Sequence, residues 1–208
     1  EDLDGWIQYD YQVDANGVSI PNAEPPGPAW LRNLVGVDFL ADVIGMNLRG
    51  TQVTAGLEHA QTLTNLRYLY LHGKHFSDAP LEHLRRFTNL EWLWLDCTQV
   101  SDDGVEHLQG LTNLKYLTLN YSRVSSAGLI YLQGLTKLEH LDLSATQITD
   151  TGLEHVKGLT KLEWLDVTDT QVSDQGAKQL QQEFPNCCIY RQPAAGSNPS
   201  SFPRTHLP

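Results

Sequence analysis

The sequence predicts an α/β fold in which short units stack into a solenoid, with a curved parallel sheet on one side and short helices on the other. Leucines recur at an interval of 24 residues, at Leu66, Leu90, Leu114, Leu138 and Leu162. After each of them, apolar residues first alternate and then recur at helical spacing. About one residue in six is leucine, so one repeating pattern dominates the chain, and such a period decides the fold.

Each unit, numbered from its first leucine, has inward positions at 1, 4, 6, 11, 16, 19 and 22. In the four units from Leu66 to Lys161, all of these positions are apolar. Positions 4 and 6 predict a short strand with one buried face, and positions 16 and 19 predict a helical turn. No unit can close a core alone, so we expect neighbouring units to stack and each strand to pair in parallel with the last.

Two polar positions also recur. We expect the hydroxyl residue at position 9 to tie its turn to the backbone of an adjacent unit; this set is Thr51, Thr98, Ser122, Thr146 and Thr170. Aspartate at position 13, as at Asp150 and Asp174, is predicted to cap the helix that follows, because a carboxylate accepts from free N–H groups there.

The ends of the repeat are less regular. Val43, Met46 and Leu48 predict a first unit that is one residue short. The sixth unit is expected to be two residues short, with Phe184, Cys187 and Ile189 at positions 1, 4 and 6 of a terminal strand. The repeats are therefore predicted to span residues 43–191, as six units and a seventh strand.

These units resemble the leucine-rich repeat family, in particular its bacterial class with the pattern Leu-x-x-Leu-x-Leu-x-x-Thr-x-Val-(Ser/Thr)-Asp-x-Gly-Leu. That class is related to the cysteine-containing repeats of F-box proteins. The resemblance covers residues 43–191. It implies a curved solenoid that binds proteins or other ligands on its concave sheet, but one fold serves many partners.

The flanking segments differ in composition. Residues 6–20 predict a hairpin around an Asn-Gly turn, followed by a proline-rich connector and short helices. We interpret residues 1–42 as an N-terminal cap on the first unit, with a buried set of Trp30, Leu34, Phe39 and Leu40. Residues 192–208 predict a flexible tail rich in proline and serine.

Charge and length exclude several classes of function. The chain has 25 acidic and 14 basic residues and a net charge of −11, which argues against a nucleic-acid binder. No apolar run reaches the about 18 residues needed to cross a membrane. The sequence does not indicate the cellular compartment. An extracytoplasmic or membrane-anchored location would depend on a segment outside this sequence.

The concave face is predicted to carry positions 3, 5 and 7 of each strand. It should place aromatic rings on three consecutive strands and an acidic strip of Asp96, Asp142 and Asp166 beside them. Clustered aromatic residues on one face are typical of a contact surface. The predicted contact residues are Tyr68, Tyr70, His72, Trp92, Trp94, Asp96, Tyr116, His140, Asp142, Trp164 and Asp166.

Other interpretations of this face remain open. The rings could stack across the strands and only stiffen the sheet. They could also stack on sugar rings, so a glycan ligand stays possible. We favour a protein or peptide partner, anchored by Trp92 and Trp94, with the acidic strip favouring basic groups.

Several residue sets resemble reactive sites without meeting the requirements of one. A histidine column at position 18, namely His59, His83, His107 and His155, recurs one per unit, so we expect a solvated face and no metal site. His140, Asp142 and Ser144 share one strand face and cannot converge as a catalytic triad. No enzyme motif is present. We therefore expect no catalysis and no cofactor.

The cysteines do not indicate a disulfide framework. Cys97 and Cys187 are predicted to lie four strands apart, which is about 19 Å and beyond disulfide reach. Cys187 and Cys188 should point to opposite faces of the terminal strand, with Cys187 in the core.

Together these observations predict a non-catalytic module that binds a protein or peptide through its concave face. The first alternative is a structural or spacer solenoid attached to a missing anchor. The second is a substrate receptor of the ubiquitin-ligase type, by analogy with F-box relatives, although no F-box-like helical segment precedes the repeats in this sequence.

Overall fold

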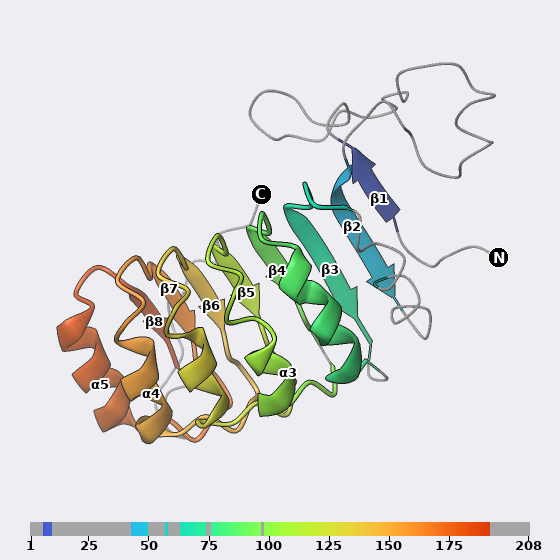
Figure 1. Cartoon of the computed structure of the whole chain (residues 1–208). Helices are drawn as coiled ribbons and strands as arrows, with labels where there is room; N and C mark the ends of the chain where they lie inside the picture. Colours follow the sequence, from blue (N-terminus) through green and yellow to red (C-terminus); the bar gives the residue numbers. More distant parts are fainter. Residues whose placement is uncertain are drawn as a thin grey trace, which may run out of the picture.

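The computed structural model describes residues 6–9, 43–49, 57, 63–73, 76–96 and 98–191. Its strands form one open sheet in which the spatial order equals the chain order, from β1 to β8 (Figure 1). The strands are β1 (Trp6–Tyr9), β2 (Val43–Arg49), β3 (Tyr68–His72), β4 (Trp92–Trp94), β5 (Tyr116–Thr118), β6 (His140–Asp142), β7 (Trp164–Asp166) and β8 (Cys188–Tyr190).

The strand register follows the repeat. β1 is antiparallel to β2, and all later neighbours pair in parallel. From β3 onward, paired residues lie 24 positions apart, as in Tyr68 with Trp92. Gly45 of β2 pairs with Tyr68, one position fewer, so the prediction of a shortened first unit is confirmed.

The predicted register of the terminal strand was wrong by two residues. Leu165, at position 4, pairs with Ile189, so the sixth unit has the full length. Phe184, expected to open the strand, instead ends the preceding helix, where its N–H donates to the Leu180 carbonyl at 3.0 Å. A shift of two preserves the faces, and Cys187 is buried as predicted.

Short helices cover one face of the sheet (Figure 1). They are η4 (Ala79–Arg86), α3 (Asp102–Glu106), η5 (Gly128–Leu132), α4 (Asp150–Val156) and α5 (Asp174–Glu183), and η4 and η5 are 3₁₀-helices. The core lies between these helices and the sheet. All the inward positions of the four units from Leu66 to Lys161 are buried, which confirms the predicted pattern.

The position-9 hydroxyls bond within their own unit, which corrects the predicted contact with a neighbour. Thr98 Oγ1 donates to the Leu95 carbonyl at 3.0 Å, and Ser122 Oγ donates to the Leu119 carbonyl at 2.6 Å. Each hydroxyl bonds the carbonyl three residues before it, at the end of the same strand, so the nearest acceptor is local. Both hydroxyl residues are buried, so these bonds stabilise the turn after each strand.

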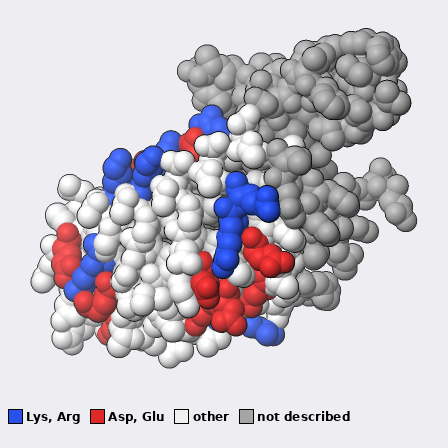
Figure 2. Space-filling model, viewed as in Figure 1, with Lys and Arg blue, Asp and Glu red and all other residues white. Residues whose placement is uncertain are grey.

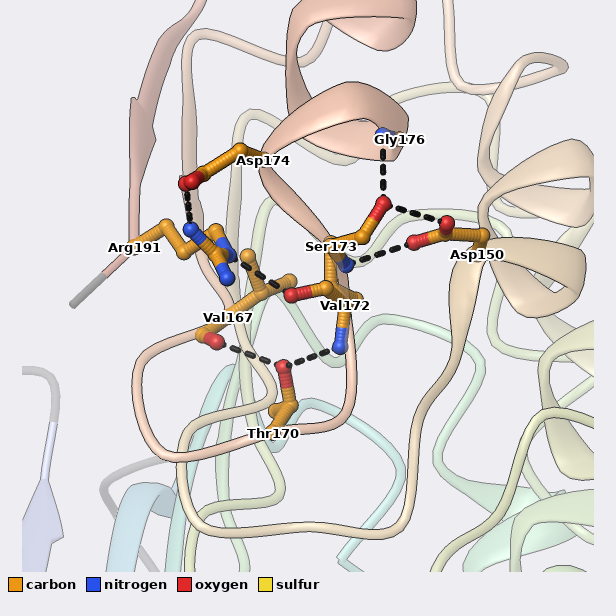
Figure 3. A network of polar contacts seen from close by, with 8 residues as sticks. All are labelled: Asp150, Val167, Thr170, Val172, Ser173, Asp174, Gly176 and Arg191. Carbon is orange, nitrogen blue, oxygen red and sulfur yellow. Dashed lines mark hydrogen bonds and ion pairs between the residues drawn. The ribbon is translucent and has the colours of Figure 1, made fainter. Parts of the chain in front are cut away.

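The position-13 aspartates join neighbouring units, whereas we had expected each to cap its own helix. The Asp150 carboxylate accepts from the Ser173 N–H at 2.7 Å and from the Ser173 hydroxyl at 2.6 Å (Figure 3). The residue that caps α5 is Ser173, whose hydroxyl accepts from the Gly176 N–H at 3.0 Å. Asp150 already lies in the first turn of α4, from which its side chain reaches the next unit.

The same arrangement repeats along the solenoid and ends at Arg191. Asp78 bonds Ser101 and Asp102 bonds Ser125 in the same two-point manner. The last member, Asp174, pairs with Arg191, which also donates to the Val172 carbonyl at 2.6 Å (Figure 3). Arg191 therefore contacts Asp174 as the serine of the next unit contacts each earlier aspartate.

Parts of the predicted flanks lie outside the described residues. These are the hairpin turn and its second strand, the helices of the proposed cap with Trp30, Leu34, Phe39 and Leu40, and the tail 192–208. Trp6–Tyr9, in the first arm of the predicted hairpin, does form a strand, and it pairs with β2. Within the described part of the chain, no helix is long and apolar enough to cross a membrane.

Candidate functional site

The concave face is the sheet face opposite the helices, and β3–β7 with the residues directly after them carry all the predicted contact residues. Residues at equal positions lie side by side on neighbouring strands, as the pairs Tyr68–Trp92, Trp92–Tyr116 and His140–Trp164 illustrate. The side chains are half-buried, apart from Tyr116, which is only 6% exposed. The sequence therefore brings these residues onto one surface.

Rings at position 3 form a continuous stack along this face. Centroid distances between successive rings are 6.2 Å for Tyr68–Trp92, 4.9 Å for Trp92–Tyr116, 5.6 Å for Tyr116–His140 and 6.2 Å for His140–Trp164. The Trp92 and Tyr116 rings are nearly parallel, at 18°. The stack follows from strand spacing, because rings at the same position of adjacent strands lie about 4.8 Å apart at their Cα atoms.

A second column at position 5 packs beside the first. The Tyr70 and Trp94 rings are 5.9 Å apart, and Trp94 lies 5.8 Å from Trp92 and 5.3 Å from Tyr116. Tyr116 is thus enclosed by two indoles, which corrects its predicted role as an exposed contact residue. Burial raises the pKa of its hydroxyl, and the charge of Asp142 adds to this rise.

Stacking changes which part of each ring a ligand can meet. The Trp92 and Tyr116 rings, nearly parallel at 18°, turn their faces toward each other, whereas other pairs such as His140–Trp164, at 37°, are tilted. Ring edges carry the positive end of the aromatic quadrupole, and those of tryptophan and tyrosine also carry N–H and O–H donors. The stacking alternative is therefore present at Trp92 and Tyr116, where a ligand cannot reach the ring faces that are turned toward each other.

Tyr190 belongs to this surface, although it is absent from the predicted set. Its ring lies 5.4 Å from that of Trp164, and its backbone pairs with Asp166. It is absent from that set because apolar matching places the terminal strand two residues out of register. Counting one full repeat from Asp166 would have reached it.

The acidic strip is held by neutral donors. Asp142 Oδ1 accepts from the Ser144 N–H at 2.8 Å and from the Ser144 hydroxyl at 2.6 Å, and Asp166 Oδ1 accepts from the Thr168 N–H at 2.7 Å. Asp96 accepts from the Thr118 hydroxyl. Neutral donors satisfy the carboxylate oxygens, and no lysine or arginine among the described residues forms an ion pair with these three acids.

Burial governs the ionisation of two of these acids. Desolvation raises the pKa of Asp96 above its ordinary value, while hydrogen bonds from Thr118 and Tyr70 act in the opposite direction. Desolvation also raises the pKa of Asp166, and the nearby charge of Asp142 adds to the effect. An ionised carboxylate in such a site favours a cationic neighbour.

The two histidines of the face have different surroundings. His72 stacks on Tyr70 with centroids 6.0 Å apart, and its Nδ1 is buried without a hydrogen-bond partner among the described residues. His140 lies in the ring stack between Tyr116 and Trp164. Because the Ser144 hydroxyl donates to Asp142, it does not make the serine–histidine contact that a triad requires.

The histidine column on the helix side and the two C-terminal cysteines are the other groups that could react or bind a metal. His155 Nδ1 lies 2.9 Å from the Gln133 amide nitrogen, and His83 lies 4.0 Å from Glu82. Across the described residues, no group of three or more potential ligands is placed to hold a metal ion. Cys187 and Cys188 are free thiols, and burial raises the pKa of Cys187 to about 11. His59 and Cys97 lie outside the described residues.

Comparisons with known proteins agree with this architecture. A family model described as Leucine rich repeat matches residues 88–148 and 112–172. No curated protein sequence matches the chain. Among solved structures, an internalin of Listeria monocytogenes is similar with a TM-score of 0.55 and 23% identity, over 70% of this chain and 38% of the internalin.

A second structure gives the same result. A leucine-rich repeat protein of Leptospira interrogans has a TM-score of 0.55 and 19% identity, over 69% of this chain and 34% of its own. This chain thus spans little more than a third of either neighbour, and at such identities the likeness concerns the fold. The family match over residues 88–172, the strand register and the two similar structures agree that the chain folds as an α/β leucine-rich repeat solenoid.

Proposed function

We propose that this chain is a non-catalytic module that binds a protein or peptide on its concave face, with Trp92 and Trp94 as anchors. The observation that carries the proposal is the row of rings from β3 to β8 on the sheet face opposite the helices. All of these rings except Tyr116 are half-buried. Leucine-rich repeats generally mediate protein–protein interaction. The threonine and aspartate positions of the unit also resemble the bacterial class of the family.

Ring geometry favours a protein partner over a glycan. Sugar rings bind aromatic side chains through their faces, but the faces of Trp92 and Tyr116 are turned toward each other at 4.9 Å. At this pair the groups left to a ligand are the ring edges with their N–H and O–H donors, and carboxylates lie beside them on the same face. These groups match the carbonyls and donors of a polypeptide, and half-buried tryptophan is enriched among residues that dominate binding energy.

The test is affinity capture from the source cell with three forms of the chain. Trp92→Ala with Trp94→Ala removes both anchors, whereas Ile130→Ala is the matched control because Ile130 is exposed by 49% and lies in η5, on the helix side. We expect the control to retain the proteins captured by the wild type and the double variant to lose them. Circular dichroism and the unfolding midpoint verify that each variant is folded.

A spacer role predicts a different result. In that case the double variant and the wild type would capture the same proteins, and the concave face would carry no partner. Trp94→Phe, which keeps a ring in the stack, provides a second folded variant if the alanine substitutions destabilise the sheet.

A further inference from the structure

The C-terminal part of the concave face has its own composition. We define the C-terminal patch as His140, Asp142, Trp164, Asp166 and Tyr190, contributed by β6, β7 and β8. Asp142 lies directly across from Asp166, and Asp166 lies directly across from Tyr190. Like charges in directly opposed positions of adjacent strands repel each other. The patch therefore holds two negative charges close together.

Nearby basic residues do not balance these charges. Within the part of the chain that the structure describes, neither Asp142 nor Asp166 forms an ion pair with lysine or arginine, and positions 3, 5 and 7 of β3–β7 contain neither residue type. Glu91 shows the contrast, because Arg67 and Lys115 both contact it at 2.7 Å. The side seen in Figure 2, with the helices toward the viewer, displays groups of both signs.

Aromatic rings border the acidic pair. His140 and Trp164 precede the two aspartates by two residues on the same strands, and their ring centroids are 6.2 Å apart. The Tyr190 ring lies on β8, the last strand of the sheet, and its centroid is 5.4 Å from that of Trp164. Rings in this position limit the access of water, and a lower local dielectric strengthens the attraction between a carboxylate and a cation. They also attract cations directly where a ring face is available.

We propose that the C-terminal patch binds a lysine or arginine side chain of an extended basic peptide segment, with Asp142 and Asp166 sharing the cation. The inference rests on the proposed function and adds the chemistry of the partner. A cation between the two carboxylates would remove their mutual repulsion and donate charge-assisted hydrogen bonds to both. The patch and the tryptophan anchors would then contact different parts of one partner.

The test uses two fluorescein-labelled nonapeptides, one alternating arginine and glycine and one alternating glutamate and glycine. Fluorescence anisotropy at about 0.1 M salt, where the Debye length is about 10 Å, measures their binding to the whole chain. We expect saturable binding of the arginine peptide and none of the glutamate peptide. Asp142→Asn with Asp166→Asn should weaken binding about tenfold or more, because it removes both carboxylate charges and keeps the side-chain shape.

The matched control removes two acids elsewhere. Asp103→Asn with Glu154→Gln changes the net charge equally on the helix side, where both residues are exposed. It should leave binding within about twofold of the wild type, since general charge is screened over such a distance. Equal losses in both double variants, or no loss at the patch, would overturn the inference.

A charge-preserving variant separates chemistry from folding. Asp166→Glu should still bind the arginine peptide, so weak binding by Asp142→Asn with Asp166→Asn reflects lost charge if both variants unfold at similar midpoints. Absence of arginine-peptide binding to the wild type also overturns the inference. The proposed function fails separately, when the tryptophan variants capture the same cellular partners as the wild type.

Discussion

The carboxylate of Asp150 accepts two hydrogen bonds from Ser173, which lies 23 residues later in the next unit. This contact couples two neighbouring repeats through one side chain (Figure 3). The fourth unit has Ser126 at the equivalent position, where its hydroxyl lies 2.9 Å from that of Thr149 and accepts from the Thr149 N–H at 3.0 Å. The coupling therefore persists there with neutral groups in place of a carboxylate.

Removing this carboxylate should destabilise the solenoid. Asp150→Ala leaves the Ser173 N–H and hydroxyl without their acceptor, and we expect a loss of about 1–3 kcal/mol in the free energy of unfolding. Urea unfolding followed by circular dichroism measures the change. Asp103→Ala is the control, because Asp103 is also an exposed acid in the first turn of a helix but has no hydrogen bond to the next unit among the described residues. If Asp103→Ala lost as much free energy of unfolding, the cause would be the interaction of an acid with the helix dipole and not the contact with Ser173.

Glycine at position 15 allows the aspartate to approach, and its substitution should also destabilise the fold. A Cβ atom at Gly176 would overlap Asp150 Oδ1, whereas one at Gly110 would meet no atom within 4 Å. We expect Gly176→Ala to lower the free energy of unfolding by about 1–3 kcal/mol and Gly110→Ala to be neutral or stabilising. Both are measured as shifts in the urea midpoint.

A double-mutant cycle identifies the cause. When Asp150→Ala is already present, Gly176→Ala should cost much less, because the overlapping carboxylate has gone. Additive losses would mean that Gly176 is needed for another reason.

Apolar spacing was sufficient to predict the core but not the polar contacts between units. Burial of the inward positions in the four units from Leu66 to Lys161 follows from periodicity alone, since hydrophobic burial depends on which face a residue occupies. The partners of Asp150 and Thr170 depend on distances of a few ångströms between turns, and a sequence pattern does not give these distances. Thr170 bonds the Val167 carbonyl in its own turn, while Asp150 bonds the next unit, although both recur at the same period.

The sequence predicted that the candidate residues share one face of the sheet, but it did not predict how their rings are arranged. Position within the strand placed Trp92, Tyr116 and Asp166 on one face. It did not indicate that Tyr116 would be enclosed, because that depends on how Trp92 and Trp94 orient their rings. The terminal strand lacks leucine, so apolar matching aligned it wrongly and omitted Tyr190.

A left-handed backbone conformation recurs at position 8 and should respond to glycine. Ala145 has a φ of 53°, a value that costs an L-residue with a side chain roughly 1–2 kcal/mol. We expect Ala145→Gly to stabilise the chain by about 0.5–1 kcal/mol, after the greater freedom of glycine in the unfolded state is subtracted. Ala127→Gly is the control, because φ there is −68° and the same change should destabilise. Thermal unfolding compares the two.

Neutralising Asp96 should stabilise the free protein at neutral pH. Burial raises the pKa of this carboxyl, so the folded state binds its proton more tightly than the unfolded state does. Its ionisation therefore lowers stability above the raised pKa, and this loss disappears as the pH falls below the ordinary value. We expect Asp96→Asn to gain about 0.5–1 kcal/mol at pH 7 and nothing in acid. Urea titrations across this range measure the difference, and a gain that persists in acid would point to a cause other than charge.

Glu91 should show the opposite dependence on pH. Burial acts to raise its pKa, but hydrogen bonds from Arg67 and Lys115 outweigh burial, and the pKa lies below its ordinary value. The ionised form is thus favoured by folding, and its contribution is present above the unfolded pKa and is lost as the pH falls through the folded one. Glu91→Gln should cost about 0.5–1 kcal/mol at pH 7, because the partners are partly exposed and screened by solvent. The cost should shrink in acid and in high salt, and a cost unchanged by either would show that packing, rather than charge, holds Glu91 between its two partners.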